Sequence, residues 1–299
     1  MAKLLQLLAL FSIFTWVALA DPLLTVLRRE GFTEFAQRVE GPDGEVVRNA
    51  CPDMIVYAPT DAGIARAASC SLVRRADKKT PNPKQHSCPQ PRRRSGRAEV
   101  TASGAVALMT LLDDPEFVNL GPEQNSSIVQ KNAPNEALGT VFSGLGGSVR
   151  VTGLDIPYDC GVIRPISGVL TLPAPLSETL PHLGADKTLD ALRRTGLLAE
   201  LDNRASITFL APNNAVFGNV SDDTALAQAL RQQVVLGPPA YSPLLVDGAS
   251  YNTLAGTTVT VSVRGPDFYI GDARILSSDA IIKNGVVHTV DKVRKPVFA

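Results

Sequence analysis

Histidine is scarce in this 299-residue chain: His86, His182 and His288 are the only three, and they lie far apart. The four cysteines are also scattered, and neither Cys-x-x-Cys nor His-x-x-x-His occurs. Metal sites in proteins need clustered ligands. The sequence therefore predicts no metal site and no other cofactor.

An excess of charge of either sign is also missing, since Lys+Arg and Asp+Glu both number 29. This balance argues against nucleic-acid binding and against an acidic disordered chain. Hydrophobic residues make up 44% and charged residues 19% of the sequence, which predicts a globular protein with a real core. The length allows one large domain or two of ordinary size.

Motifs of nucleophilic catalysis are absent too. Gly-x-Ser-x-Gly does not occur, and the glycine-rich stretch 143–148 lacks the Lys-Ser/Thr of a phosphate loop, so we predict a hairpin turn there. The acidic pairs Asp113-Asp114 and Asp222-Asp223 are typical of helix starts rather than of paired catalytic carboxylates. The sequence predicts no enzyme, and a hydrolase of wall material is the less favoured alternative.

Only one long apolar run is present, at the N-terminus. Lys3 precedes an uncharged stretch, 4–19, that closes on Ala18-Leu19-Ala20. This pattern predicts a secretory signal peptide over 1–20, with Asp21 as the first mature residue; an N-terminal membrane anchor is the alternative. No second run of 18 apolar residues follows, and the C-terminus is too charged for a lipid-anchor signal. We expect a secreted or cell-surface protein, with the vacuole as the alternative.

Two sequons fit the secretory route. Asn125 begins Asn-Ser-Ser and Asn219 begins Asn-Val-Ser, so both are candidate glycosylation sites.

Three segments of the first half return in the second half in the same order. They pair 24–32 with 189–197, 55–62 with 208–215, and 161–169 with 285–293. We interpret this as a tandem repeat, with copy one at 21–175 and copy two at 176–299. Between the second and third segments, copy one takes 102 residues from Pro59 to Gly161, whereas copy two takes 73 from Pro212 to Gly285.

The extra length in copy one is a basic insertion at about 71–100. Its stretch from Arg74 to Arg97 holds nine Lys/Arg, one Asp and four prolines, with almost no large apolar residue. Such a segment buries too little apolar area to offset chain ordering, so we predict a disordered surface loop. It suggests contact with an anionic polymer or lipid, or processing at a dibasic pair; a tolerated solvated insertion is the alternative.

Within each copy, the pattern predicts helices first and strands later, which is the α+β class. Apolar residues spaced for a helical hairpin turn at Gly31 in copy one and recur in copy two. The segments 55–57 and 207–210 predict short buried strands that Ala-Pro ends, and 257–263 and 268–270 predict two later strands. Thr60-Asp61 and Asn213-Asn214 then offer helix N-caps.

The segments 208–217 and 284–291 resemble the two signature boxes of fasciclin-type domains, and copy one matches more loosely, with Ile64, Arg164 and Ser167 at the Phe, His and Asp positions. The order and the interruption resemble fungal members. The resemblance implies two β-wedges with packed helices and a role in extracellular adhesion or matrix interaction. The family-motif residues are Ala58, Pro59, Thr60, Asp61, Ala211, Pro212, Asn213, Asn214, Phe217, Gly285, His288 and Asp291.

The family's central Tyr-His motif, in the context Leu-x-Tyr-His-Val-Val-Pro-Gly, aligns with 230–237, where Gln232 and Gln233 stand instead. Arg-Gly-Asp is also absent, so we do not expect an integrin-like mode. We interpret His288 as a structural histidine bonded to backbone or to Asp291, with a ligand or general base as the alternative.

The cysteines allow three pairings if all are oxidised. Cys70 and Cys88 bracket the basic loop, which suggests a clip between them. Cys51 and Cys160 would then tie together two strands that we expect to be neighbours. The alternative pairings stay open at the level of sequence.

The leading hypothesis is a secreted, non-enzymatic tandem fasciclin-like protein. Its expected partner is a matrix or cell-wall component or another surface protein, and not a nucleic acid. The alternative is a vacuolar or secretory-lumen protein without an adhesion role.

Overall fold

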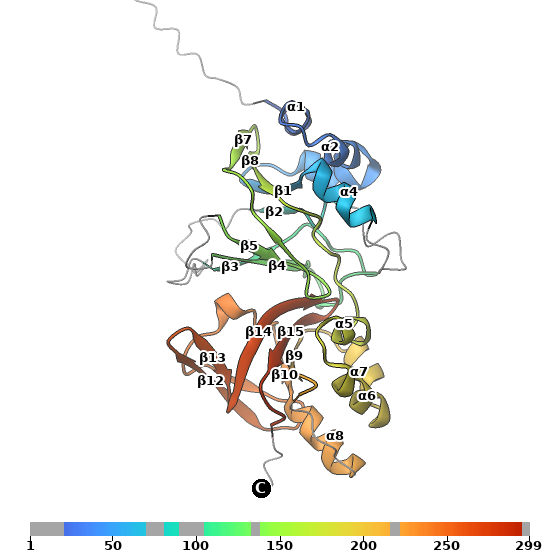
Figure 1. Cartoon of the computed structure of the whole chain (residues 1–299), viewed down its shortest axis with the longest axis vertical. Coiled ribbons are helices and arrows are strands. Elements are labelled where there is room, and N and C mark those ends of the chain that lie inside the picture. Colours follow the sequence, from blue (N-terminus) through green and yellow to red (C-terminus); the bar gives the residue numbers. More distant parts are fainter. Residues whose placement is uncertain (1–20, 70–80, 90–104, 133–137, 216–221, 295–299) are drawn as a thin grey trace, which may run out of the picture.

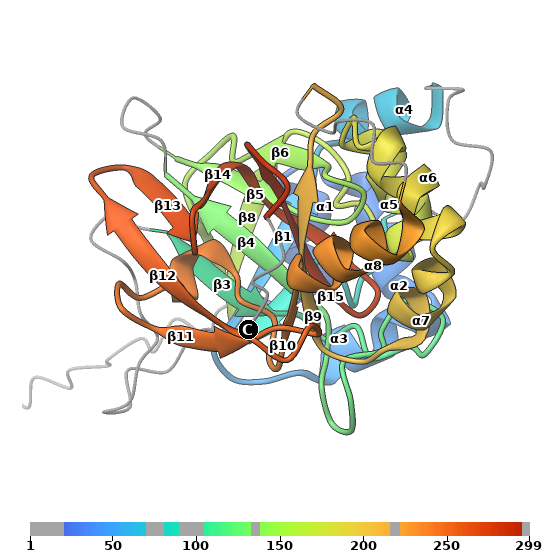
Figure 2. The ribbon, with the colours of Figure 1, turned by 90° about the horizontal axis from the view of Figure 1, so that it is seen from below.

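The computed structural model describes residues 21–69, 81–89, 105–132, 138–215 and 222–294. The first half (21–175) and the second half (176–294) follow one another along the long axis (Figure 1). Seen along that axis, the helices gather on one side and the outer strands on the other (Figure 2). The predicted signal peptide lies outside the described residues.

The first half places its helices around the first strand. The helical segments are α1 (Leu23–Arg29), α2 (Thr33–Glu40), η1 (Pro42–Gly44), α3 (Glu45–Asn49) and α4 (Asp61–Ser69). The strands are β1 (Met54–Pro59), β2 (Ser87–Pro89), β3 (Val106–Met109), β4 (Ser127–Lys131), β5 (Thr140–Phe142), β6 (Ser148–Arg150), β7 (Ile156–Tyr158) and β8 (Gly161–Ile166).

The second half has the same order of helices before strands. Its helical segments are α5 (Leu176–His182), α6 (Asp186–Arg194), α7 (Leu197–Asn203), α8 (Asp223–Gln232) and η3 (Ser242–Leu244). Its strands are β9 (Ile207–Pro212), β10 (Val234–Leu236), β11 (Ser250–Asn252), β12 (Thr258–Arg264), β13 (Asp267–Ile270), β14 (Ala273–Ile282) and β15 (Gly285–Val290). The mixed content of helix and strand is the predicted α+β class.

A glycine turns the helical hairpin in each half. Gly31 follows α1 with φ of 84°, and Gly196 lies between α6 and α7 with φ of 71°. This left-handed conformation favours glycine because no Cβ is present to clash. The predicted hairpins are therefore confirmed, and their apolar faces lie against the strands.

A parallel strand pair forms the centre of each half. β1 pairs with β8 from Met54↔Gly161 to Pro59↔Ile166. β9 pairs with β15 from Ile207↔Gly285 to Pro212↔Val290, in the same register. Every residue of β1, β9 and β15 is buried, which explains their largely apolar sequences.

The remaining strands extend these pairs into curved sheets. The strand orders are β2-β1-β8-β7 and β3-β4-β5-β6 in the first half, and β10-β9-β15-β14-β13-β12-β11 in the second half. A bridge from Val151 to Ile166 connects the two sheets of the first half. A bridge from Val235 to Thr253 joins the two ends of the second sheet, which therefore curls toward closure.

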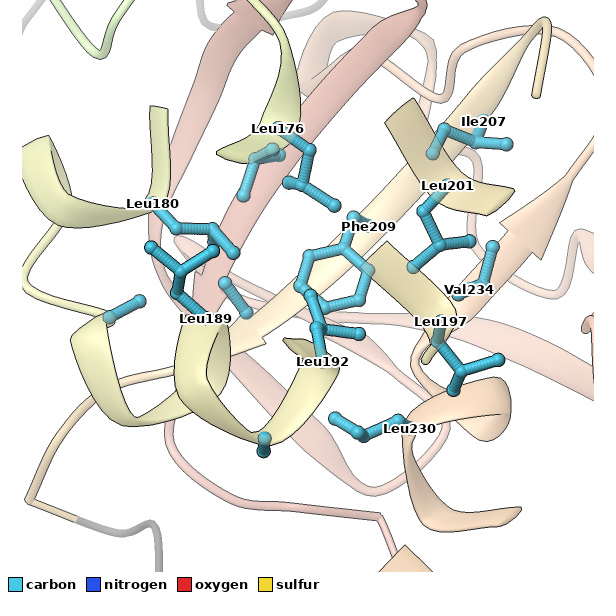
Figure 3. Packing of buried hydrophobic residues seen from close by; sticks show 14 of the residues in the cluster. Leu176, Leu180, Leu189, Leu192, Leu197, Leu201, Ile207, Phe209, Leu230 and Val234 are labelled. Atoms are coloured by element: carbon cyan, nitrogen blue, oxygen red, sulfur yellow. The ribbon is translucent and has the colours of Figure 1, made fainter. Parts of the chain in front are cut away.

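Each half has its own apolar core. In the second half, Phe209 of β9 lies among leucines from α5, α6, α7 and α8 (Figure 3). In the first half, Phe35 of α2 packs with Val56 of β1 and Ile163 of β8. The core thus lies between the helices and the central parallel pair.

The two halves meet through β14. Val129 of β4 packs with Tyr241, Ile281 and Val286 of the second half. Ile281 also donates its N–H to the Ser143 carbonyl at 3.2 Å, and Lys283 donates its own to Ala174 at 2.9 Å. The halves therefore share both an apolar cluster and backbone hydrogen bonds.

The predicted disorder of the basic insertion is wrong for residues 81–89. This stretch contains β2, which pairs antiparallel with β1, and Gln85 to Cys88 are buried. Backbone pairing with β1 and the burial of Cys88 supply the stabilisation that the composition did not suggest. The remaining insertion residues, with most of its basic charges, lie outside the described part.

Two other sequence predictions concern acidic pairs and the glycine-rich stretch. Asp222 accepts hydrogen bonds from Thr224 and Ala225 at the start of α8, as predicted. Asp113-Asp114 does not begin a helix: Asp114 accepts the Glu116 N–H in a turn, and Asp113 pairs with Lys84 at 2.9 Å. The stretch 143–148 connects β5 to β6, which confirms the hairpin turn.

No helix in the described ranges has both the length and the apolar character to cross a bilayer.

Candidate functional site

The Ala-Pro residues end the two central strands. Ala58 and Ala211 are fully buried. Pro59 and Pro212 occupy the last positions of β1 and β9, where pairing with the parallel neighbour also ends. These four residues therefore lie in the core rather than on a binding surface.

The polar residues after each Ala-Pro tie loops and helices to the strand ends. Thr60 accepts the Gly63 N–H at 3.1 Å and so caps α4, as predicted. Asn213 accepts the Ala215 N–H at 3.0 Å, and the residues beyond Ala215, including Phe217, lie outside the described part.

The second polar residue in each motif contacts a different helix from the one predicted. Asp61 accepts the Glu34 N–H of α2 at 3.0 Å, and Asn214 accepts the Lys187 N–H of α6 at 3.0 Å. Both acceptors satisfy an amide in the first turn of a preceding helix, where such groups have no partner within the helix. They fasten the helical layer to the end of the central strand.

Gly285 and its counterpart Gly161 allow close backbone contact. A Cβ on Gly285 would lie 1.8 Å from the Ile207 carbonyl oxygen, and one on Gly161 would lie 2.0 Å from the Met54 oxygen. No side chain fits at such distances. These glycines are therefore required by the parallel pairing.

His288 is a buried structural residue. Its Nε2 donates to the Ala240 carbonyl at 2.9 Å, and its Nδ1 accepts the Asp279 N–H at 3.2 Å. Burial lowers the pKa of His288, which favours the neutral ring that this bonding requires. Both nitrogens are occupied by backbone groups, which leaves neither free to act as a base.

Asp291 does not bond to His288. Its carboxylate accepts the Arg274 N–H at 2.9 Å. In the first half, the Ser167 hydroxyl oxygen accepts the Arg150 N–H at 3.1 Å. In the first half, Ser167 therefore makes the same kind of backbone contact that Asp291 makes in the second half.

Arg164 occupies the register position of His288, opposite Tyr57 of β1. Its guanidinium binds both carboxylate oxygens of Asp155, at 2.7 and 2.6 Å, and Gln130 at 2.9 Å. Tyr57 donates to the same Gln130 oxygen at 2.8 Å, and burial raises the pKa of its hydroxyl. The two halves thus fill equivalent positions with different polar networks.

His86 is a buried polar residue that the sequence did not single out. β2 pairs with β1 as β10 pairs with β9, so His86 stands where Gln233 stands in the second half. The backbone hydrogen bonds agree with this equivalence. The Tyr57 N–H donates to the His86 carbonyl at 2.8 Å, and the Leu210 N–H donates to the Gln233 carbonyl at 2.9 Å. The His-x-x-Pro spacing of His86 to Pro89 matches the Tyr-His motif and was the available signal.

His86 is fully bonded, whereas Gln233 is not. The His86 Nδ1 donates to the Tyr57 carbonyl at 2.7 Å, and its Nε2 accepts the Leu170 N–H at 3.2 Å. Burial lowers the pKa of His86 to about 4. The Gln233 side-chain amide is buried, and neither of its polar atoms has a hydrogen-bond partner among the described residues.

Lys131 and Asp279 form a buried ion pair that the sequence did not indicate. The Lys131 Nζ lies 2.5 Å from Asp279 Oδ2, and the Asp279 side chain is completely buried. Burial alone would raise the pKa of Asp279, but Lys131 and the hydrogen bonds from Ser242 hold it below its ordinary value. The only sequence signal was a carboxylate within the strand that leads to Ile281 and Ile282.

The bridge between Cys51 and Cys160 is present, with Cα atoms 4.9 Å apart. In the second half, the Asn284 amide donates to the Leu201 and Arg204 carbonyls, both at 2.6 Å, at the equivalent place. The predicted clip between Cys70 and Cys88 is wrong because Cys88 is a free, buried thiol in β2. Burial raises the pKa of that thiol, and Cys70 lies outside the described residues.

Only one of the two sequon asparagines lies within the described residues. Asn125 is half-buried and its Nδ2 donates to the Thr110 carbonyl at 3.0 Å. Asn219 lies outside the described residues. Glycosylation of either residue stays a prediction.

Three exposed apolar residues lie on neighbouring elements where the halves meet. Met109 ends β3, and β3 contacts η3, which ends at Leu244. Met109, Leu244 and Val246 are 52%, 42% and 44% exposed, and we refer to these three residues as the junction patch. No group of three or more potential metal ligands is gathered in the described ranges. The junction patch is the candidate binding surface.

Residues 184–296 match the family model of the fasciclin domain. The chain is 29% identical over 194 residues to a fasciclin-like arabinogalactan protein of Arthroderma benhamiae, covering 62% of this chain and 45% of the relative. It is 28% identical over 201 residues to the fasciclin-like arabinogalactan protein CTB11 of Cercospora beticola, covering 64% and 53%. Fungal proteins with fasciclin domains are therefore among its homologues, and the chain spans about half of their length.

An animal relative and a solved structure also match. The pig transforming growth factor-beta-induced protein ig-h3 is 30% identical over 184 residues, covering 58% of this chain and 26% of the relative. A FAS1 domain pair from the insect cell adhesion molecule fasciclin I covers 91% of this chain and 98% of its own, at 14% identity and a TM-score of 0.40.

Proposed function

We propose that this chain is a secreted, non-enzymatic protein of two fasciclin-type units that binds a cell-wall or matrix component through its surface. The observation that carries the proposal is the fasciclin match over 184–296, together with the fungal homologues named arabinogalactan proteins.

The division into two units, 21–175 and 176–299, is supported by equivalent contacts. Both halves centre on a parallel strand pair in the same register, and both use a glycine against the opposing carbonyl. Asp53 and Ser206, which precede β1 and β9, have positive φ angles of 63° and 54°. A duplicated unit accounts for such agreement at low sequence identity.

A binding role rather than catalysis is supported by where the motif residues lie. His288 bonds to backbone on both nitrogens, and the Asp291 carboxylate accepts a backbone N–H. A general base needs a free nitrogen or oxygen within reach of substrate. The motif therefore builds the fold, and recognition is left to the surface.

The junction patch is the surface that we propose for binding. Exposed apolar residues gathered on neighbouring elements are typical of interaction sites. Its residues come from both halves, so a ligand there would contact both units at once. Fungal wall polymers and extracellular proteins present apolar sugar faces and side chains that such a patch can cover.

The test is sedimentation of the purified protein with insoluble fungal wall, chitin or β-glucan, beside adsorption to a collagen coat. The variant carries Met109→Ser, Leu244→Ser and Val246→Ser, and the control is Leu154→Ser, whose side chain is 79% exposed. We expect wild type and control to bind at least one support and the triple variant to bind several-fold less, at unchanged melting temperature. Binding of the triple variant equal to wild type would reject the junction patch, and no binding of wild type to any support would reject the proposed function.

A further inference from the structure

Lys131 reaches across the junction with a charged side chain that is only 24% exposed. Its ammonium lies 2.5 Å from Asp279 Oδ2, donates to Ser278 Oγ at 2.6 Å and sits 4.4 Å from the centre of the Phe142 ring. Three different partners therefore surround it, two of them on β14 of the second half. A lysine this enclosed has a defined position rather than a solvated one.

Asp279 joins three elements. Its Oδ1 accepts the Ser242 N–H at 2.8 Å, and its Oδ2 accepts the Ser242 hydroxyl at 2.5 Å as well as Lys131. Ser242 begins η3, so one carboxylate connects β4, β14 and η3. The residue itself has φ of 70°, at an irregularity in the pairing of β14 with β15.

Contacts within the second half hold this carboxylate in place. Ser242 fixes both oxygens, and His288 accepts the Asp279 N–H, so the second half alone sets the position of the group. Within the second half the charge has no cationic partner among these contacts. Lys131 of the first half supplies it, and a buried charge without a partner is strongly unfavourable.

Several contacts hold the junction together. Val129, Tyr241, Ile281 and Val286 form a buried apolar cluster, and the Ile281 and Lys283 N–H groups donate to carbonyls of the first half. Lys131 and Asp279 add a contact between charged side chains of the two halves. A buried ion pair contributes little net stability compared with apolar groups, whereas separating its two charges is strongly unfavourable.

We propose that Lys131 and Asp279 form a latch that fixes the first half on the second in one orientation and thereby assembles the junction patch. The latch holds η3, which carries Leu244, against the half that carries Met109. The part concerning the patch rests on the proposed function, whereas the fixed orientation does not.

The test measures the distance between one spin label on each half by pulsed electron paramagnetic resonance. The labels go on Gln37→Cys and Ala199→Cys, which are exposed positions on α2 and α7, with Cys70→Ser to prevent extra labelling. Lys131→Met removes the cation, and Lys131→Met with Asp279→Asn removes both charges while Asn tolerates the positive φ. Lys187→Met, an exposed lysine on α6, is the matched control.

We expect one narrow distance distribution for wild type and the control, and a broad or multiple distribution for both latch variants. The double variant keeps a melting temperature within a few degrees of wild type because no buried charge is left unpaired. It remains informative if Lys131→Met alone does not fold. A wild-type distribution in the double variant would overturn the latch.

The sedimentation assay separates the two parts of the proposal. Loss of binding in the double variant, together with a broad distance distribution, supports assembly of the patch by the latch. A broad distribution with wild-type binding would overturn that assembly while the latch stands. Failure of wild type to bind would reject the proposed function without affecting the distance result.

Discussion

The contact between Gly285 and the Ile207 carbonyl shows how a single residue controls the central pairing. We expect Gly285→Ala to lower the free energy of unfolding by more than about 2 kcal/mol because its Cβ must displace backbone. Gly248→Ala is the control: Gly248 has φ of 78° with no atom within 4 Å of an added Cβ, so only strain of about 1 kcal/mol applies. Urea unfolding of both variants makes the comparison, and equal losses would contradict the contact argument.

At Gln233, in contrast, we expect a substitution to stabilise the protein. Its buried amide lacks partners among the described residues, whereas His86 at the equivalent place makes two hydrogen bonds. We expect Gln233→His to raise the free energy of unfolding by about 1 kcal/mol, since each new buried hydrogen bond contributes that order.

The control for this substitution is Gln233→Leu. If leucine stabilises as much as histidine, the gain comes from removing an unpaired amide rather than from restored bonds. A clear destabilisation by histidine would mean that the second half has lost the geometry that the first half retains.

At the scale of elements, the buried histidine next to β2 makes the stability of the first half sensitive to acid. Because His86 beside β2 has a folded pKa of about 4 against about 6.5 when unfolded, the unfolded state binds more protons below pH 6.5. Stability is therefore full above pH 6.5 and is lost as the pH falls toward 4. The loss due to His86 is about 2 kcal/mol at pH 5.

The measurement is urea unfolding at pH 7 and pH 5 for wild type, His86→Gln and the exposed His182→Gln. His86→Gln should show a smaller loss between the two pH values, because Gln does not titrate and is tolerated at the equivalent position 233. His182→Gln should behave as wild type. Burial also lowers the pKa of His288, so every variant keeps the part of the stability loss at low pH that is due to His288. An unchanged loss in His86→Gln would contradict the buried neutral ring.

At the scale of the whole molecule, the disulfide closes a long segment of the first half. Cys51 and Cys160 are 109 residues apart in sequence, so reduction frees a long loop in the unfolded chain. We expect Cys51→Ser with Cys160→Ser to lower the free energy of unfolding by up to about 5 kcal/mol, on a loop-entropy basis.

The second half supplies the comparison for that bridge. Asn284→Ala removes two hydrogen bonds at the equivalent position and should cost about 2 kcal/mol, through unpaired carbonyls rather than loop entropy. Differential scanning calorimetry resolves the effects, and adding reductant to wild type should reproduce the double cysteine variant. No shift on reduction would contradict the role of the bridge.

Much of each central unit could be predicted from the sequence because its signals are local. Alternating or continuous apolar residues predicted β1, β9, β12 and β13, and Gly31 and Gly196 marked the hairpin turns. The sequence also indicated that Cys51 and Cys160 open two neighbouring strands, and the parallel pairing of β1 with β8 agrees with this. These features depend on residues near one another or on a pattern that occurs twice.

Long-range pairing decided the rest, since no local pattern encodes it. The segment with His86 and Cys88 has the composition of a disordered loop, yet β1 offers it an unpaired edge and a buried position. Lys131 and Asp279 are 148 positions apart, and only docking of the halves brings their charges together. The sequence by itself determined the repeated unit through its periodicity and turn residues, whereas the tertiary structure determined how the two copies dock, because burial and charge pairing depend on distance in space.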